Sequence, residues 1–188
     1  MILLIIGLTL WFGVHLIPSL AIPFRERLIT ALGEKSYKII FAVLIVGSIV
    51  AMVFGWRSID PVNIYVLPEW SRPITLLLVL ITFILFSAAH STTNIRRIIR
   101  HPQLTGLALW SIGHLISNGD NRSLILFGTL GVWAIVEIYL ISRREGVWVK
   151  PESALIKSEL LMLSKGLVMF AVFLFAHPYI SGVPVIPQ

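Results

Sequence analysis

Cysteine is absent from the 188-residue sequence, and charged residues make up only 13% of it. Without thiols the chain forms no disulfide, thiolate ligand or cysteine nucleophile, so a bound metal or haem iron would need histidine, methionine, tyrosine or carboxylate ligands. Soluble domains of this size carry about twice this fraction of charge. Dinucleotide-binding, P-loop, H-E-x-x-H and G-x-S-x-G motifs are also absent. The sequence therefore does not match a common soluble enzyme.

Apolar residues are what the chain has in excess: 57% are hydrophobic, with a mean hydropathy of +0.91. They form long blocks, which predict an all-α, polytopic membrane helix bundle whose residues 1–188 make one domain. The first block has neither the basic start nor the cleavage site of a secretory signal, so we expect a retained span. Six transmembrane helices are predicted, at residues 2–22, 37–56, 73–90, 104–117, 123–142 and 160–180. The fourth is short, since a span needs roughly 20 residues.

Lys and Arg residues predict the orientation. Twelve of the 15 lie in or beside the first, third and fifth connectors, and three lie in the second and fourth. Because basic connectors stay on the cytoplasmic side, we expect both termini on the periplasmic side of a bacterial inner membrane. This placement of the charge also argues for a lipid bilayer and against nucleic acid as the partner of the basic residues. The third connector, residues 94–100, has Ile and Arg at helical spacing and predicts a short amphipathic interfacial helix.

Histidines inside apolar segments are the candidate ligands. His15 lies in the first span and His114 in the fourth, and each follows a glycine within two residues. At ~1.5 Å rise per residue, both fall toward the middle of the bilayer. Each histidine alone is more simply a hydrogen-bonding residue between helices. Together they fit the two axial ligands of a haem b, with small neighbours that admit the flat porphyrin and Trp110 in its apolar surroundings.

Other polar residues have weaker claims to function. Arg100 and His101, before Pro102, mark either a helix start with a basic flank or a contact to an anion or headgroup. Glu137 lies inside the fifth span, where an ion pair with a nearby basic residue competes with a catalytic role. His90 and His177 are expected at span ends. The segment from Asn118 to Asp120 is expected to form a turn, with Asp120 or Asn121 capping the next helix.

The segment "RHPQLTGLALWSIGHLISNGD", followed by "SLILFG" and preceded by "GVHLIPSL" and "GEKSYKIIF", resembles the NnrU family of bacterial membrane proteins. That family is associated with nitrite and nitric oxide reduction in denitrification. The resemblance extends to the zeta-carotene isomerase family, whose haem b is held by histidines that match His15 and His114 by position. Those isomerases have a cysteine three residues before the second histidine, where this chain has Ser111. The departure puts their redox-controlled change of ligand in doubt here.

Three functions stay open on this basis. The first is a haem b protein, acting as a redox accessory of a respiratory reductase or as an isomerase-like enzyme on a lipophilic substrate. The second is a membrane methyltransferase of the isoprenylcysteine type, with Arg100 and His101 binding S-adenosylmethionine. The third is a non-catalytic membrane assembly factor. Whether the chain is an enzyme, and what its catalytic residues are, the sequence leaves open.

Overall fold

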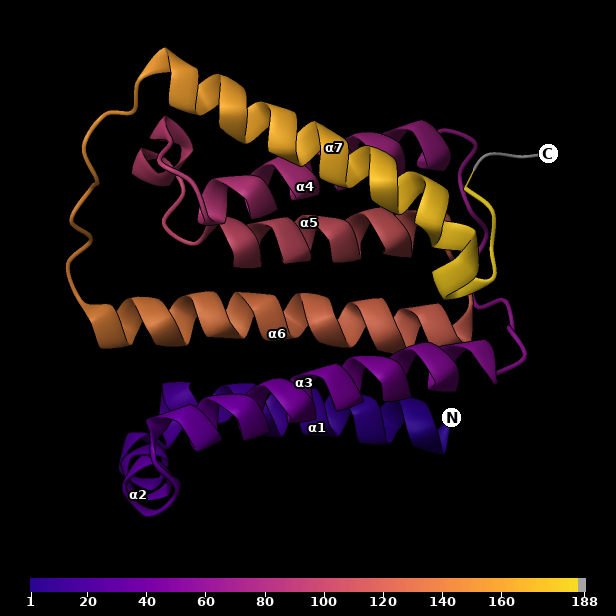
Figure 1. Ribbon diagram of the computed structural model, residues 1–188. Helices are drawn as coiled ribbons and strands as arrows, with labels where there is room; N and C mark the ends of the chain where they lie inside the picture. The colour runs from indigo at the N-terminus through magenta and orange to yellow at the C-terminus, as the bar shows by residue number, and fades with distance from the viewer. Residues whose placement is uncertain (186–188) are drawn as a thin grey trace. The chain divides into compact units, whose positions relative to one another are not determined.

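The computed structural model describes residues 1–185. Within them every regular element is a helix, apart from an isolated bridge between Asn63 and Asp120, so the predicted all-α class is confirmed. The helices are α1 (Ile2–Leu20), α2 (Ile22–Leu32), α3 (Glu34–Arg57), α4 (Ser71–Ala89), the 3₁₀ helix η1 (Asn94–Arg97), α5 (Pro102–Ser117), α6 (Asn121–Glu145) and α7 (Ile156–Ser181). Figure 1 shows them in chain order.

Among the described residues, five helices are long and apolar enough to span a membrane: α1, α3, α4, α6 and α7. Each of the six predicted spans coincides with one helix. However, α5 has only 16 residues, fewer than the roughly 20 that a span needs. The prediction of six transmembrane helices is therefore confirmed for five candidates only. An unpredicted helix, α2, follows α1 directly and is separated from α3 by Gly33, whose φ of 79° favours glycine.

The chain divides into two compact units, Met1–Pro61 and a second that begins at Val62. In the first, α1 and α3 pack together along their lengths, and α2 touches both. Two glycines bring these backbones close, because a Cβ at Gly7 would lie 2.8 Å from Met52 N and one at Gly55 would lie 2.7 Å from Leu4 Cα. Close backbone approach at small residues is the usual basis of helix packing in membranes.

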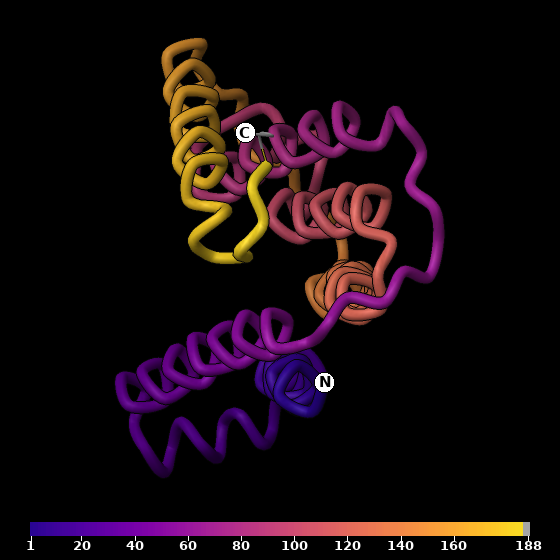
Figure 2. The backbone as a smooth tube through the Cα atoms, turned by 90° about the vertical axis from the view of Figure 1, so that its right-hand side faces the viewer, coloured from indigo at the N-terminus to yellow at the C-terminus, as the bar shows by residue number. Residues whose placement is uncertain are grey.

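In the second unit, α4 packs against α5 and α7, while α6 packs on the other side of α5 (Figures 1 and 2). Threonines and glycines at equal spacing join α4 to α5. Thr75 donates to the Gly113 carbonyl at 2.7 Å, and Thr82 to the Gly106 carbonyl at 2.9 Å. These bonds satisfy hydroxyls that would otherwise be exposed to hydrocarbon, and they fix the position of α5.

The predicted amphipathic helix over residues 94–100 is wrong in length and type. Only the four residues of η1 are helical, in a 3₁₀ turn. Glu159 of α7 accepts hydrogen bonds from Thr93 Oγ1 at 2.7 Å and from the Asn94 backbone N–H at 2.5 Å. Downstream, Pro102 disfavours helix at the residue before it, and His101 has φ −123° and ψ 71°. The segment is therefore tied to α7 at one end and extended at the other.

Candidate functional site

His114 lies on α5 within a cluster of aromatic rings. The ring centres of Trp110 and Phe127 lie 4.6 and 4.4 Å from that of His114, and Trp110 and Phe127 also contact each other edge to face at 4.8 Å. Phe127 comes from α6 and is buried, with 6% of its surface exposed. The imidazole is thus held half-buried between two helices, in apolar surroundings contributed by aromatic side chains.

The Nδ1 atom of His114 lies 2.9 Å from the carbonyl oxygen of Trp110, one helical turn earlier. A carbonyl only accepts, so Nδ1 carries the proton and donates it. In the neutral ring, Nε2 then carries the lone pair. A backbone carbonyl that orients one nitrogen in this way is the usual second partner of a metal-binding histidine.

His15 in α1 has the same local geometry. Its Nδ1 donates to the Trp11 carbonyl at 2.9 Å, the Trp11 ring lies 4.2 Å away, and a phenylalanine from the next packed helix, Phe41, lies at 5.7 Å. Both histidines therefore belong to a W-x-x-x-H sequence with the tryptophan carbonyl as acceptor. The sequence singled out both histidines as polar residues in apolar segments, each near a glycine, and the repeated tryptophan spacing was not used.

The glycines near the two histidines have different surroundings. A Cβ at Gly113 would make ordinary contacts with Leu78 and Thr75 of α4, at 3.4 and 3.6 Å, so Gly113 lies at the α4–α5 contact. No atom of the first unit lies within 4 Å of a Cβ placed at Gly13. The expectation that small residues admit a porphyrin beside each histidine thus finds no support at Gly113.

His177 lies near the C-terminal end of α7, at the end of a candidate span as expected, and it also lies beside His114. The two ring centres are 6.4 Å apart, with the planes inclined by 30°. His177 Nδ1 donates to the Val183 carbonyl at 2.8 Å, just after α7. His90 is exposed at the C-terminal cap of α4, as expected. His177 is therefore a residue of the His114 surroundings that the sequence did not reveal.

Asn118 and its neighbours form the turn between α5 and α6. Asn118 Nδ2 donates to the His114 carbonyl at 2.8 Å, and Asp120 accepts from the Ser123 backbone N–H at 2.9 Å, which confirms Asp120 as the cap of α6. Tyr65 donates to the carbonyls of Leu115 and Asn118. Burial, with a smaller effect of the Asp120 carboxylate, raises the pKa of the Tyr65 hydroxyl above its usual value, which keeps it a donor. Asn118 thus has a structural role at the end of α5.

Glu137 is buried in α6, with 3% of its surface exposed. A carboxyl in apolar surroundings is costly unless it is protonated or paired. Arg144, one of the partners expected from the sequence, forms an ion pair with Glu145 at 3.8 Å. The accessory role of Glu137 stays a prediction.

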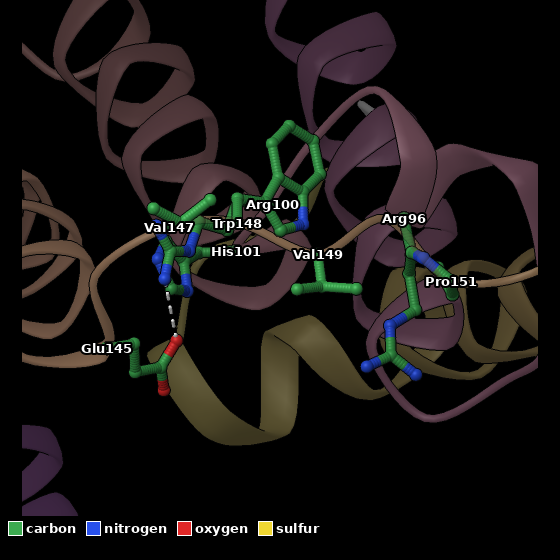
Figure 3. A pocket seen from close by; sticks show the side chains of 8 residues that line it. All are labelled: Arg96, Arg100, His101, Glu145, Val147, Trp148, Val149 and Pro151. Atoms are coloured by element: carbon green, nitrogen blue, oxygen red, sulfur yellow. Dashed lines mark hydrogen bonds and ion pairs between the residues drawn. The ribbon is translucent and has the colours of Figure 1, made fainter.

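Arg100 and His101 lie at the opposite end of α5 from Asn118, around a surface pocket (Figure 3). Arg100 donates to the Gly146 carbonyl at 2.9 Å and pairs with Glu145 at 3.3 Å. His101 Nε2 lies 2.9 Å from Ser142 Oγ. Burial lowers the pKa of His101 below 6.5; Glu145 opposes this shift and Arg100 reinforces it. His101 is therefore neutral at pH 7, and the positive charge here comes from arginine.

In the part of the chain that the structure describes, no three histidine, aspartate or glutamate residues are grouped so that they could hold a metal ion. A bound iron would therefore have fewer than three ligands from these residue types. His15 belongs to the first unit and His114 to the second.

Long apolar helices, joined by small residues and buried hydroxyl bonds, define a polytopic α-helical integral membrane protein. The chain belongs to the NnrU family, because the family model described as "NnrU protein" matches residues 3–185. No curated protein and no solved structure matches the sequence. The resemblance seen in the sequence is thus confirmed at the level of the family.

Proposed function

We propose that this NnrU-family protein binds haem b within the membrane, with His15 and His114 as the axial ligands. The observation that carries the proposal is the repeated W-x-x-x-H geometry, in which both Nδ1 atoms donate to a tryptophan carbonyl at 2.9 Å. With Nδ1 as the donor, Nε2 is the nitrogen through which each ring would bind the iron. The histidine positions of the zeta-carotene isomerase family, which the chain resembles, support the same pair.

The residues around the two histidines fit a haem in chemical type. Tryptophan and phenylalanine rings contact both imidazoles and form apolar surroundings, which disfavour charge and so tune an iron centre. When bound, haem would supply a one-electron couple and a site for small gaseous ligands. The chain's own residues orient the imidazoles and place aromatic rings against them.

A redox or gas-responsive accessory role in nitrite and nitric oxide reduction is the function we favour. The association of the NnrU family with those reductases supports it. An isomerase-like activity on a lipophilic polyene is the second candidate within the same haem hypothesis. A thiol-dependent isomerase mechanism is disfavoured, because Ser111 stands at the position of the cysteine. Ser111 is 1% exposed and lies at the α5–α6 contact, where a Cβ at Gly131 would lie 3.0 Å from Ser111 Cβ.

The methyltransferase alternative receives less support. Arg100 and His101 are already engaged by Gly146, Glu145 and Ser142, so their hydrogen-bonding groups serve the connection between α5 and α6. A non-catalytic assembly factor is the remaining alternative. It predicts a colourless protein that co-purifies with a reductase subunit.

An optical spectrum of the detergent-solubilised full-length protein tests the proposal. We expect a Soret band with sharp α and β bands on reduction, and a low-spin ferric signal in paramagnetic resonance. His15→Ala and His114→Ala should each abolish the low-spin signal, whereas His90→Ala, which removes an exposed histidine, should leave it unchanged. If both ligand variants keep the wild-type spectrum, the assignment is wrong.

A further inference from the structure

The pocket at the basic end of the second unit has a chemistry that the haem proposal does not use. Its volume is about 430 Å³, within the range of ~300–1,000 Å³ typical of small-ligand sites. It is lined by Arg96, Arg100, His101, Glu145, Val147, Trp148, Val149 and Pro151. Figure 3 shows Arg96 on one side of Val149, with Arg100, His101 and Glu145 on the other.

Two arginines bring positive charge to opposite sides of this pocket. The one lining carboxylate, Glu145, is engaged by Arg100 at 3.3 Å and by Arg144 at 3.8 Å, so its charge is balanced by cations. Lys150 adds a further cation, with its Nζ 5.5 Å from the centre of the Trp148 ring. The resulting field favours an anion, and guanidinium groups are well suited to the oxygens of phosphate.

The backbone around the pocket is fixed by contacts between elements. The bonds from Thr93 and Asn94 to Glu159 hold η1, which carries Arg96, against the start of α7. The bond from Arg100 to the Gly146 carbonyl holds the connector that carries Val147 and Trp148. The backbone that carries the two arginines is thus held in place by hydrogen bonds, which lowers the conformational entropy lost when a ligand binds.

Exposed apolar residues surround the charged ones and indicate where the anion comes from. Val147 and Val149 are 90% and 85% exposed, and Ile98 and Ile156 at the same end of the helices are 79% and 78% exposed. Apolar side chains beside a basic cluster are typical of protein segments at the membrane interface, where acyl chains meet anionic headgroups. An anionic lipid therefore matches both the positive charge of the pocket and the exposed apolar residues around it.

We propose that this pocket binds a phosphate group, and that its source is the headgroup of an anionic phospholipid. Arg96 binds the phosphate oxygens and Arg100 adds positive charge beside them, while Val147 and Val149 contact the lipid. The proposal does not depend on haem, because neither His15 nor His114 lines this pocket.

Lipid binding to the purified full-length protein in detergent, measured by native mass spectrometry, tests the site. The probes are phosphatidylglycerol, zwitterionic phosphatidylcholine, inorganic phosphate and S-adenosylmethionine. Arg97→Gln is the matched control for Arg96→Gln, because Arg97 is the next residue of η1, is exposed, and does not line the pocket. Arg100 also holds the connector, so Arg96→Gln is the primary variant and Arg100→Gln the second.

We expect phosphatidylglycerol to bind more tightly than phosphatidylcholine, and Arg96→Gln to weaken it about fivefold, as for the loss of one basic residue near a membrane surface. Arg97→Gln should leave the affinity unchanged. Inorganic phosphate that binds in an Arg96-dependent manner, with no preference between the two lipids, would support the phosphate site but overturn the lipid as its source. Equal losses of phosphatidylglycerol affinity in Arg96→Gln and Arg97→Gln would contradict binding in this pocket. Arg96-dependent binding of S-adenosylmethionine alone would overturn the lipid proposal. Haem spectra of the same variants keep this result separate from the proposed function.

Discussion

The imidazole rings of His114 and His177 lie 6.4 Å apart, centre to centre, although the two residues belong to different helices. Their Nδ1 atoms have different acceptors: the Trp110 carbonyl within α5, and the Val183 carbonyl beyond the end of α7. His114 is therefore fixed by its own helix, whereas His177 also holds the chain that follows α7. This difference favours His114 over His177 as the proposed ligand.

His177→Ala separates these two roles. Loss of the ring contact and of the hydrogen bond to Val183 should destabilise the protein by about 1–2 kcal/mol. The haem content and the low-spin spectrum should remain, because the proposed ligands are untouched. Thermal unfolding followed by circular dichroism, together with the optical spectrum, measures both effects. Should His177→Ala lose the low-spin signal while His15→Ala keeps it, His177 would replace His15 as the second ligand.

Asp120 provides a test of the turn between α5 and α6. Its carboxylate accepts from the Ser123 backbone N–H at 2.9 Å and from Ser123 Oγ at 2.8 Å, and it pairs with Arg122 at 3.6 Å. Asp120→Ala removes a helix cap and should lower the free energy of unfolding by about 1 kcal/mol. Asp120→Asn, which keeps an acceptor, should lose less. Equal losses in the two variants would assign the effect to the ion pair with Arg122 and not to the cap.

Apart from α2, the α-helices were predictable from the sequence, because apolar blocks and helix ends are local features. Asp120 was one of two residues predicted as the cap, and Pro102 was predicted as a helix start, from residue type and position alone. The 3₁₀ turn at η1 was not predictable in this way. Its Ile and Arg spacing fits a helix, but the bonds from Thr93 and Asn94 to Glu159 depend on a residue more than sixty positions away.

The candidate site was predictable only in part, for the same reason. His15 and His114 stand out as polar residues in apolar segments, and the Trp at the fourth position before each is visible in the sequence. The approach of His177 to His114 depends on how α7 packs on α4, which no local pattern encodes. Likewise, the arginine pocket brings η1 and the residues before α5 together with the end of α6 and the segment after it. Such juxtapositions follow from tertiary packing.

Gly55 tests how α1 and α3 pack. A Cβ at this position would lie 2.7 Å from Leu4 Cα, so Gly55→Ala must push two backbones apart. We expect a loss of about 1–3 kcal/mol, typical of overpacking, and a weaker hold on any ligand of His15. Gly47→Ala is the matched control on α3, because no atom of its unit lies within 4 Å of a Cβ there. Thermal unfolding of both variants measures the difference, and a Gly55→Ala protein as stable as Gly47→Ala would contradict this packing.

His101 should make the stability depend on pH. Burial is the main reason why its pKa lies below the ordinary value of 6.5; Glu145 opposes the shift and Arg100 reinforces it. The folded protein therefore binds the His101 proton less readily than the unfolded chain does. The resulting contribution to stability is fully present above about pH 6.5 and is lost as the pH falls from there toward the folded pKa. His101→Gln, whose amide can still hydrogen-bond to Ser142, removes the titrating group. Thermal unfolding at about pH 7.5 and 5.5 should show a smaller loss on acidification for His101→Gln than for the wild type. An equal or larger loss in the variant would mean that the acid sensitivity arises at other residues.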